Sequence, residues 1–232
     1  MKKLITGLLL AVSLSFGFES DFLPGYTIDA KCSQILHKKA FDICYSYADK
    51  SPKFVVYEIE GDNLRGTHYK RKGMRFKPDY QIPIKYRSYT KDFSHTGFDR
   101  GHNAPNGSFN YNKTLQKETF LLSNISAQKP QLNRRLWSKI ERFSRMQALK
   151  YGSVSVVTGV CGSLGHIKNN VNIPAYWYKL ILLPNGKMVS FLAPNTNRGM
   201  SKAKAKDYLS DIETIEKTCN IKLLKQKDIL SD

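Results

Sequence analysis

A histidine in an unusual setting is the first residue that could perform chemistry. His102 ends the run Gly97-Phe98-Asp99-Arg100-Gly101-His102, in which an acid, a base and a glycine precede the imidazole. We expect Gly101 to let the backbone turn sharply, so that the ring faces a bound phosphate. A neutral imidazole with an ordinary pKa of about 6.5 is a competent general base at neutral pH. The remaining histidines lack such a setting, and a lone histidine is more often a surface or packing residue.

A second group of polar residues lies on the clearest helix, predicted over residues 131–150 and ended by Gly152. Its apolar residues recur at helical spacing and predict a core-facing stripe; they are Leu132, Leu136, Ile140 and Phe143. A second stripe borders the first because its members are each four residues apart; they are Asn133, Trp137, Glu141 and Arg145.

The polar stripe has two interpretations, which spacing alone does not separate. In one, Glu141 and Arg145 form a surface pair that stabilises the helix by about 0.2–0.5 kcal/mol. In the other, the stripe is the edge of a site. The Asn133 amide oxygen then binds a hard cation, Glu141 orients the water molecules of that ion, and Arg145 binds phosphate. Mg²⁺ suits such a site because it keeps several waters and needs few protein ligands.

The charge of the chain favours a polyanionic partner. Its 232 residues contain 37 Lys and Arg against 19 Asp and Glu, a formal net charge of +18. Such a balance disfavours cationic substrates and favours nucleic acid, an anionic membrane or a sulfated glycan. Basic residues also alternate with tyrosines in the irregular segment 60–98, which suits a nucleic-acid groove. A hydrophobic content of 41% excludes a disordered composition.

The beginning of the chain is typical of a secretory signal peptide. Met1-Lys2-Lys3 is followed by a nearly continuous apolar run over residues 4–16, with small residues at its end. The run is too short for a permanent transmembrane helix. We therefore expect a signal peptide over residues 1–18, with an approximate cut near Gly17 or Glu19. The prediction is an exported protein, periplasmic or extracellular, with no stable membrane anchor.

Export changes the interpretation of the four cysteines. They form no CxxC pair, which makes a zinc site improbable, and an even count in an oxidising compartment indicates disulfides. Three pairings are open. Proximity along the chain favours Cys32–Cys44 and leaves Cys161–Cys219, and free buried thiols remain the alternative.

The other elements indicate one α+β domain over residues 19–232, because strands and helices mix without regular βαβ alternation. Strands are predicted over 54–59, 120–125 and 153–160, and a closing helix over 202–217. Residues 176–183 and 187–193 flank Pro184-Asn185-Gly186, which predicts a hairpin.

Further motifs extend the two chemical groups into one ordered pattern. It consists of Asp99-Arg100-Gly101-His102, Ala104-Pro105, Leu122-Ser123-Asn124-Ile125, Gln128, Leu132-Asn133, Trp137 and Glu141. This pattern resembles the DNA/RNA non-specific endonuclease family of the ββα-metal (His-Me finger) superfamily, which includes secreted bacterial sugar-non-specific nucleases and endonuclease G-like enzymes. The likeness covers about residues 54–218. The chain departs from the family at Ala127, where proline is usual, but this position carries no proposed catalytic group.

The resemblance implies a ββα-metal nuclease fold with a central, mainly antiparallel sheet flanked by helices. It implies that His102 is the general base, that Asn133 is the sole direct protein ligand of a divalent ion, and that Glu141 holds metal-bound waters. The cofactor would be Mg²⁺, with Mn²⁺ or another divalent ion as an alternative. The reaction would be hydrolysis of DNA and RNA with little sequence specificity, leaving a 5′-phosphate.

The resemblance also implies the residues around the scissile phosphate. Arg100 and Arg145 match arginines near it, and one further arginine upstream is either Arg71 or Arg75. Asn124 matches an asparagine that borders and supports the site. The oligomeric state stays open.

Two other functions compete with this interpretation. An exported cationic protein that binds nucleic acid without cleavage would explain the charge, but not the register of His102, Asn133 and Glu141. A metal-dependent phosphoesterase of small phosphate esters would keep the metal site, but would have little need of so much positive charge.

Overall fold

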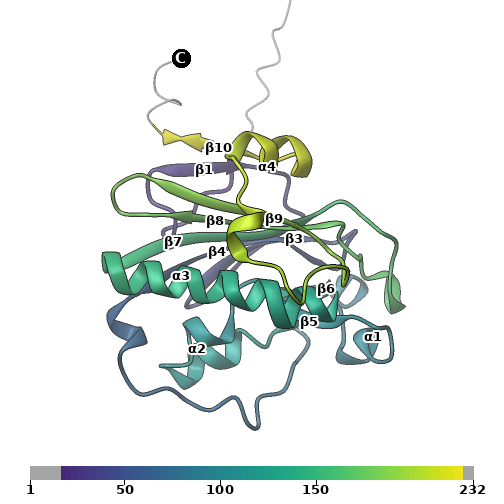
Figure 1. Ribbon diagram of the computed structural model, residues 1–232. Coiled ribbons are helices and arrows are strands. Elements are labelled where there is room, and N and C mark those ends of the chain that lie inside the picture. Colours follow the sequence, from purple (N-terminus) through teal and green to yellow (C-terminus); the bar gives the residue numbers. More distant parts are fainter. Residues whose placement is uncertain (1–16, 227–232) are drawn as a thin grey trace, which may run out of the picture.

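The centre of the molecule is a six-stranded antiparallel sheet in the order β2-β3-β4-β7-β8-β9 (Figure 1). The computed structural model describes residues 17–226. The strands are β2 (Gln34–His37), β3 (Phe41–Ser46), β4 (Ser51–Glu60), β7 (Ser153–Cys161), β8 (Tyr176–Leu182) and β9 (Met188–Pro194). Strands β4 and β7 are buried along nearly their whole length, because layers cover both faces of the sheet. The predicted α+β class with a mainly antiparallel sheet is confirmed.

Two different layers cover the sheet (Figure 1). Helix α3 (Ser138–Tyr151) packs on one face through the predicted apolar stripe. The other face carries β1 (Tyr26–Asp29), β10 (Lys222–Lys225) and α4 (Ile212–Cys219), which we call the terminal layer. Strands β1 and β10 pair with each other, so the two ends of the described chain close this layer together.

A separate two-stranded ribbon precedes α3 in the chain. Strand β5 (Asp99–His102) pairs with β6 (Ile125–Gln128), with His102 opposite Ile125. The segment between them contains the short helix α2 (Lys113–Glu118), and a further short helix, α1 (Thr90–Phe93), precedes β5. After β6 the chain enters a π-helical turn (Leu132–Trp137) that continues directly into α3. Two strands and a helix thus surround the candidate chemical residues.

Several sequence predictions are confirmed. The strands predicted over 54–59 and 153–160 lie within β4 and β7, and the hairpin is β8–β9. Helix α3 ends at Gly152, whose φ of 90° is unfavourable for residues with a side chain. Residues 60–98 are irregular apart from short helical turns.

The strand predicted over 120–125 is wrong for most of its length. Leu122–Asn124 forms a 3₁₀ turn, and the strand starts only at Ile125. The residues are buried, as their apolar character suggests, but they pack in a turn. The Asn124 side chain bonds this turn to the backbone of Ala104 and Thr119.

The single helix predicted over 202–217 is also wrong. The structure has a 3₁₀ turn at Ala205–Tyr208 and a separate helix, α4. Between them Leu209 bridges to Phe191 of the sheet, and Asp211 accepts a hydrogen bond from the Thr214 N–H as the N-cap of α4. A sheet contact and a cap thus interrupt the helical periodicity.

The fold bears on the predicted signal-peptide cut, although residues 1–16 lie outside the described chain. Phe18 is 2% exposed and packs edge-on against Phe54. Its backbone exchanges two hydrogen bonds with Ile28. Residue 18, the last one of the predicted signal peptide, is thus part of the folded core, and the cut itself stays a prediction. In residues 17–226 no helix has the length and apolarity needed to cross a membrane.

Both predicted disulfides are present, Cys32–Cys44 and Cys161–Cys219, so the alternative of free thiols is wrong. The first joins the segment after β1 to β3, and the second joins β7 to the end of α4. Each therefore attaches the terminal layer to the sheet.

Removal of the second disulfide should destabilise the protein strongly. The bond joins cysteines 58 residues apart. Loop-closure entropy for this separation predicts that Cys161→Ser/Cys219→Ser lowers the free energy of unfolding by about 4 kcal/mol. Urea unfolding of the double variant beside the parent, both oxidised, measures the difference. An unchanged midpoint would show that the bond does not restrain the unfolded chain.

Candidate active site

The imidazole of His102 lies in an aromatic pocket. Its ring centroid is 5.3 Å from that of Phe76 and 5.1 Å from that of Phe120. The side chain is buried, and in the described part of the chain its Nε2 atom has no hydrogen-bond partner. One ring nitrogen is thus held without a protein partner at the end of β5.

The protonation of His102 differs from the ordinary behaviour expected from the sequence. Burial, together with a smaller contribution from the nearby Arg71 charge, lowers the pKa of His102 from 6.5 to about 3. The ring is therefore neutral at pH 7, as a general base must be. An anionic phosphate near the ring would raise this pKa, because it favours the imidazolium.

Gly101 is required for close packing and not for the expected sharp turn. It lies inside the extended strand β5. A Cβ atom at this position would come within 2.4 Å of Gln128 Oε1 and 2.8 Å of the Trp177 ring. Because Gly101 has no side chain, β5 can pack closely against Gln128 of β6 and Trp177 of the central sheet. This close packing helps to position His102, the next residue of β5.

Asn124 supports the chain just after His102 and does not reach into the site. Its Oδ1 accepts the Ala104 N–H at 2.8 Å. Its Nδ2 donates to the carbonyls of Ala104 and Thr119, both at 2.9 Å. The amide is fully buried and its donors are used, so Asn124 is a positioning residue.

Asn133 is tied to β5 by a carboxylate. Its Nδ2 donates to Asp99 Oδ2 at 2.8 Å, and Arg134 grips the same carboxylate with Nε at 2.8 Å and Nη2 at 2.6 Å. Burial opposes ionisation of Asp99, but the hydrogen bonds from Arg134 and Asn133 outweigh it and lower the pKa of Asp99. The amide nitrogen is thereby committed to Asp99, so that Oδ1 is the atom of Asn133 that could serve as a ligand.

Asn133 also lies in the π-helical turn, which changes the spacing assumed from the sequence. A π turn bonds residues five apart, so the side-chain direction changes relative to a continuous α-helix. Asn133, Glu141 and Arg145 are nevertheless all partly buried, at the border of the core. The predicted border position is observed, while Trp137 is fully buried against Trp177.

Glu141 is surrounded by positive charges. Burial raises the pKa of Glu141, and the charges of Lys179, Arg145 and Arg71 oppose this, in decreasing order. No ion pair within 4 Å involves Glu141 in the part of the chain that the structure describes. The carboxylate thus faces three cations at longer range and keeps its oxygens for other partners.

The structure distinguishes the two upstream arginines by position. The Arg71 guanidinium lies 5.4 Å from the Phe120 ring, which contacts His102, and its charge acts on both His102 and Glu141. Arg75 is exposed and makes no such contact among residues 17–226. Of the two, Arg71 is therefore the arginine that lies near His102 and Glu141.

The other two arginines, Arg100 and Arg145, come from different elements and have different neighbours. Arg100 shares the Phe76 ring with His102, at 5.6 Å, and donates to the Thr90 carbonyl at 2.7 Å. Arg145 lies over Gly107, where a Cβ would be 3.3 Å from its Nη1. Arg100 is thus anchored to the α1 segment, whereas Arg145 points from α3 toward the loop that follows β5.

Sequence reasoning missed two groups. The aromatic wall of Phe76 and Phe120 had no motif to mark it. The second is Lys179, which is completely buried on the α3 side of the sheet. A lysine inside the apolar run of β8 was the available signal, because a buried ammonium needs partners.

A hard divalent ion fits the donors at this site. Among residues 17–226 no three His, Cys, Asp or Glu side chains converge into a metal cage. The donors present are the Asn133 amide oxygen and the Glu141 carboxylate, both oxygen ligands. Such a set suits Mg²⁺, which keeps most of its water shell.

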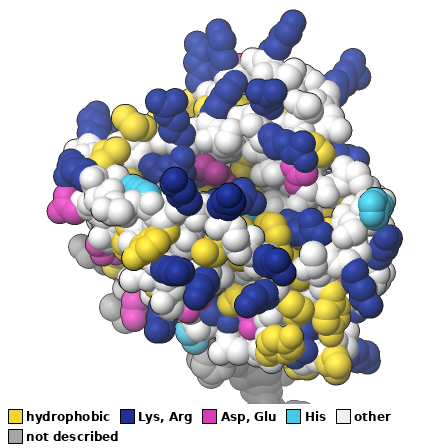
Figure 2. All heavy atoms as spheres, turned by 90° about the horizontal axis from the view of Figure 1, so that it is seen from below, with side chains coloured by type: hydrophobic (Ala, Val, Ile, Leu, Met, Phe, Trp, Pro, Cys, Tyr) yellow, Lys and Arg dark blue, Asp and Glu magenta, His cyan; other side chains and the backbone are white. Residues whose placement is uncertain are grey.

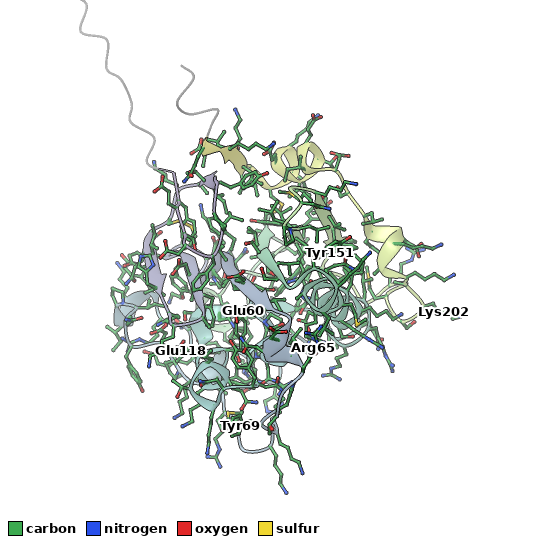
Figure 3. All side chains as sticks on the ribbon, turned by 90° about the vertical axis from the view of Figure 1, so that its left-hand side faces the viewer. Glu60, Arg65, Tyr69, Glu118, Tyr151 and Lys202 are labelled. Atoms are coloured by element: carbon green, nitrogen blue, oxygen red, sulfur yellow. A yellow bond between two sulfur atoms is a disulfide. The ribbon has the colours of Figure 1, made fainter. Side chains whose placement is uncertain are left out.

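The face that carries the site is basic. Figure 2 shows the molecule from below, with Lys and Arg side chains spread across it and outnumbering acidic ones. In Figure 3, Tyr69 lies at the bottom of the molecule, below Glu60 and Arg65. The irregular segment therefore runs from the end of β4 down to the bottom of the molecule.

The known proteins that this chain resembles in sequence are nucleases. A sequence profile of the DNA/RNA non-specific endonuclease family matches residues 23–228. Nuclease C1 of Cunninghamella echinulata var. echinulata is 32% identical over 203 residues, covering 77% of this chain and 79% of that protein. Human mitochondrial endonuclease G is 25% identical over 206 residues, covering 82% and 69%.

A solved structure shares the fold. The crystal structure of the EndoG/EndoGI complex, described as showing the mechanism of EndoG inhibition, matches with a TM-score of 0.74 at 24% sequence identity. The match covers 81% of this chain and 84% of the other. The ββα arrangement around His102 is thus part of a known architecture.

The lowered pKa of His102 should make the protein less stable in acid. The unfolded chain binds a proton near pH 6.5, whereas the folded chain binds it only near pH 3. The contribution of neutral His102 to the free energy of unfolding is therefore fully present above pH 6.5. It is lost as the pH falls from 6.5 toward about 3, by up to about 1.4 kcal/mol per pH unit. Urea unfolding from pH 7 to pH 4 should show this slope, reduced in His102→Gln and kept in the exposed control His166→Gln. Equal slopes in all three proteins would contradict the burial effect.

Proposed function

The chain belongs to the DNA/RNA non-specific endonuclease family, and from this we propose how its own residues cleave nucleic acid. It is a hydrolase of phosphodiester bonds. In the proposal His102 is the general base and Asn133 holds a divalent ion. The observation that carries it is the neutral, buried imidazole near Arg71 at one end of β5, together with the Asn133 amide, which is bonded to Asp99 at the other end of the same strand.

His102 removes a proton from the attacking water. The ring is neutral in the free protein. It packs against Phe76 and Phe120, and the hydrogen bonds of Asn124 to Ala104 hold the chain that follows it. Binding of the phosphate raises the basicity of the ring at the moment when a base is needed. General base catalysis of this kind contributes about 10²–10⁴-fold to the rate.

Asn133, in the π-helical turn, and Glu141, in α3, are the residues that would hold the cation. The Asn133 oxygen would be its direct ligand, and the Glu141 carboxylate would accept hydrogen bonds from waters of the ion. A divalent ion bound here, Mg²⁺ or Mn²⁺, would stabilise negative charge on the phosphoryl oxygens and on the departing oxygen.

The arginines hold the substrate and stabilise the charge that develops on it. Arg71 and Arg145 approach the site from the irregular segment and from α3, while Arg100 is restrained beside His102. The basic face supplies the remaining contacts, which are to phosphates and not to bases. Both DNA and RNA are therefore substrates, with little sequence specificity.

We further propose that the protein is exported to the periplasm or the extracellular space. The apolar segment over residues 4–16, outside the described chain, supports this. The two disulfides support it as well, because such bonds persist in oxidising compartments.

Replacement of the base should abolish cleavage but not binding. His102→Ala should lower the rate by about 10²–10⁴-fold, because water loses its general base. The assay is degradation of plasmid DNA and of RNA by the purified protein, with Mg²⁺ or with chelator, beside a gel-shift measurement. The exposed His166→Ala is the matched control and should cleave normally. Full activity of His102→Ala would sink the assignment, and retarded but intact DNA with the parent would favour the binding-protein alternative.

Replacement of the amide ligand should change the metal requirement. Asn133→Ala should raise the Mg²⁺ concentration for half-maximal cleavage by about tenfold or more. Asn220→Ala, which removes an amide at the end of α4, is the control. A Mg²⁺ titration of each variant on plasmid DNA measures the effect, and an unchanged titration for Asn133→Ala would exclude it as the ligand.

A further inference from the structure

Tyr69 is an aromatic residue on the surface of the irregular segment, beside a run of three cations. Its side chain is 46% exposed, and the cations at 70–72, Lys-Arg-Lys, are exposed as well. In the described part of the chain, the Tyr69 ring stacks on no other aromatic ring and lies under no cation. The exposed Tyr80 differs, because the Arg87 guanidinium covers its ring at 4.8 Å. The ring of Tyr69 is thus open to a planar ligand.

The backbone of Tyr69 is held on both sides of this ring. Its N–H donates to the Asn110 carbonyl at 2.7 Å, and its carbonyl accepts a hydrogen bond from Gln116 Nε2 at 3.2 Å. Gln116 is fully buried, and the same nitrogen donates to Asn106 Oδ1 at 2.9 Å. An aromatic side chain has only two rotatable bonds, so a ring on a fixed backbone loses little conformational entropy when it binds a ligand.

These anchors connect Tyr69 to the candidate active site. Asn106 and Asn110 belong to the loop that leaves β5 directly after His102. Gly107 of this loop lies against Arg145, one of the site arginines. Tyr69 lies at the bottom of the molecule in Figure 3, and the view from below in Figure 2 shows a surface rich in Lys and Arg. The ring therefore stands on the basic face, on a backbone that is attached to the active-site loop.

An exposed aromatic ring among cations has the composition of a surface that binds unpaired nucleic acid. Cations bind the phosphates there, and aromatic rings stack on the faces of the bases. Tyr69 and Arg71 are two positions apart, so their Cα atoms lie no more than about 7 Å from each other. A phosphate held by Arg71 would thus place the base of an adjacent nucleotide within reach of the Tyr69 ring.

Only a base that has left its own stack can use this ring. In a duplex each base is covered by its neighbours and presents its edges in the grooves. In a single strand, a loop or a frayed end, the face of a base is accessible. Stacking on such a face reads no base edge, which agrees with low sequence specificity.

We propose that Tyr69 is a stacking platform for one unstacked nucleobase of the substrate. The inference rests on the proposed function, because it takes nucleic acid as the ligand of the basic face. The cations hold the phosphates of any strand, whereas the ring adds affinity only where a base is free to stack. Tyr69 therefore favours single-stranded segments among the substrates.

The test compares three ligands that differ in their bases. They are a thymidine single strand, an abasic strand of the same length and charge, and a duplex of the same length. The variants are Tyr69→Ala and Tyr69→Phe, with Tyr80→Ala as the control for loss of an exposed tyrosine whose ring is already covered. Binding is measured by fluorescence anisotropy in the presence of chelator, so that no step requires metal. The bonds that anchor Tyr69 use its backbone and are available in each variant.

Tyr69→Ala should weaken binding of the thymidine strand by about fivefold or more, as loss of one stacked base does. Its effect on the abasic strand and on the duplex should be no more than about twofold, because neither offers a free base. Tyr69→Phe keeps the ring and should bind all three ligands like the parent. Tyr80→Ala should also match the parent.

Several results would overturn the inference. One is equal weakening of the thymidine and abasic strands by Tyr69→Ala, which would show that the side chain only supports the loop or the phosphate contacts. Others are unchanged binding of the thymidine strand by that variant, and a parent protein that does not bind the strand. If Tyr69→Ala lowers the thermal unfolding midpoint, Tyr69→Leu replaces it, because leucine keeps apolar bulk without a ring, and the same outcomes apply. Absence of Mg²⁺-dependent cleavage by the parent would instead refute the proposed function, since the binding measurements involve no cleavage.

Discussion

The carboxylate of Asp99 joins the two halves of the site, and the geometry depends on it. It lies three residues before His102 on β5 and accepts hydrogen bonds from Asn133 and Arg134 on the helical side. Without it, the strand that carries the imidazole and the helix that carries the amide would be held near each other only by apolar packing. Packing alone can set the distance between this strand and the helix, but it does not orient the Asn133 amide, whose oxygen and nitrogen have nearly the same shape. The hydrogen bond to Asp99 distinguishes the two atoms.

The parts of the fold that sequence reasoning predicted are those with local causes. The helix over 131–150 follows from apolar residues at helical spacing and from Gly152 at its end. The β8–β9 hairpin follows from Asn185-Gly186 between two β-rich runs. The disulfide pairs follow from proximity for Cys32–Cys44, which leaves one partner each for the others. The site motif was recognisable because its residues occur in a fixed order.

The parts that were missed have causes distant in the sequence. The turn at Leu122–Asn124 depends on bonds from Asn124 to a segment 20 residues earlier. The closing helix is divided because Leu209 reaches the sheet. The low pKa of His102 depends on Phe76 and Phe120, which come from two different loops. The hydroxyl partners of Lys179 come from Tyr57 and Thr158, on two other strands. The residue pattern within one helix or strand does not predict contacts of this kind between segments that are distant in the sequence.

Both disulfides attach the terminal layer to the face of the sheet opposite α3. Within residues 17–226 the side that carries His102 therefore has no disulfide, and its order comes from packing, hydrogen bonds and the Arg134–Asp99 ion pair. While the four cysteines are reduced, packing and hydrogen bonds alone hold the terminal layer on the sheet. Once they are oxidised, the covalent bonds restrain this layer as well. The durability of the terminal layer therefore depends on the redox state of its surroundings, whereas that of the opposite face does not.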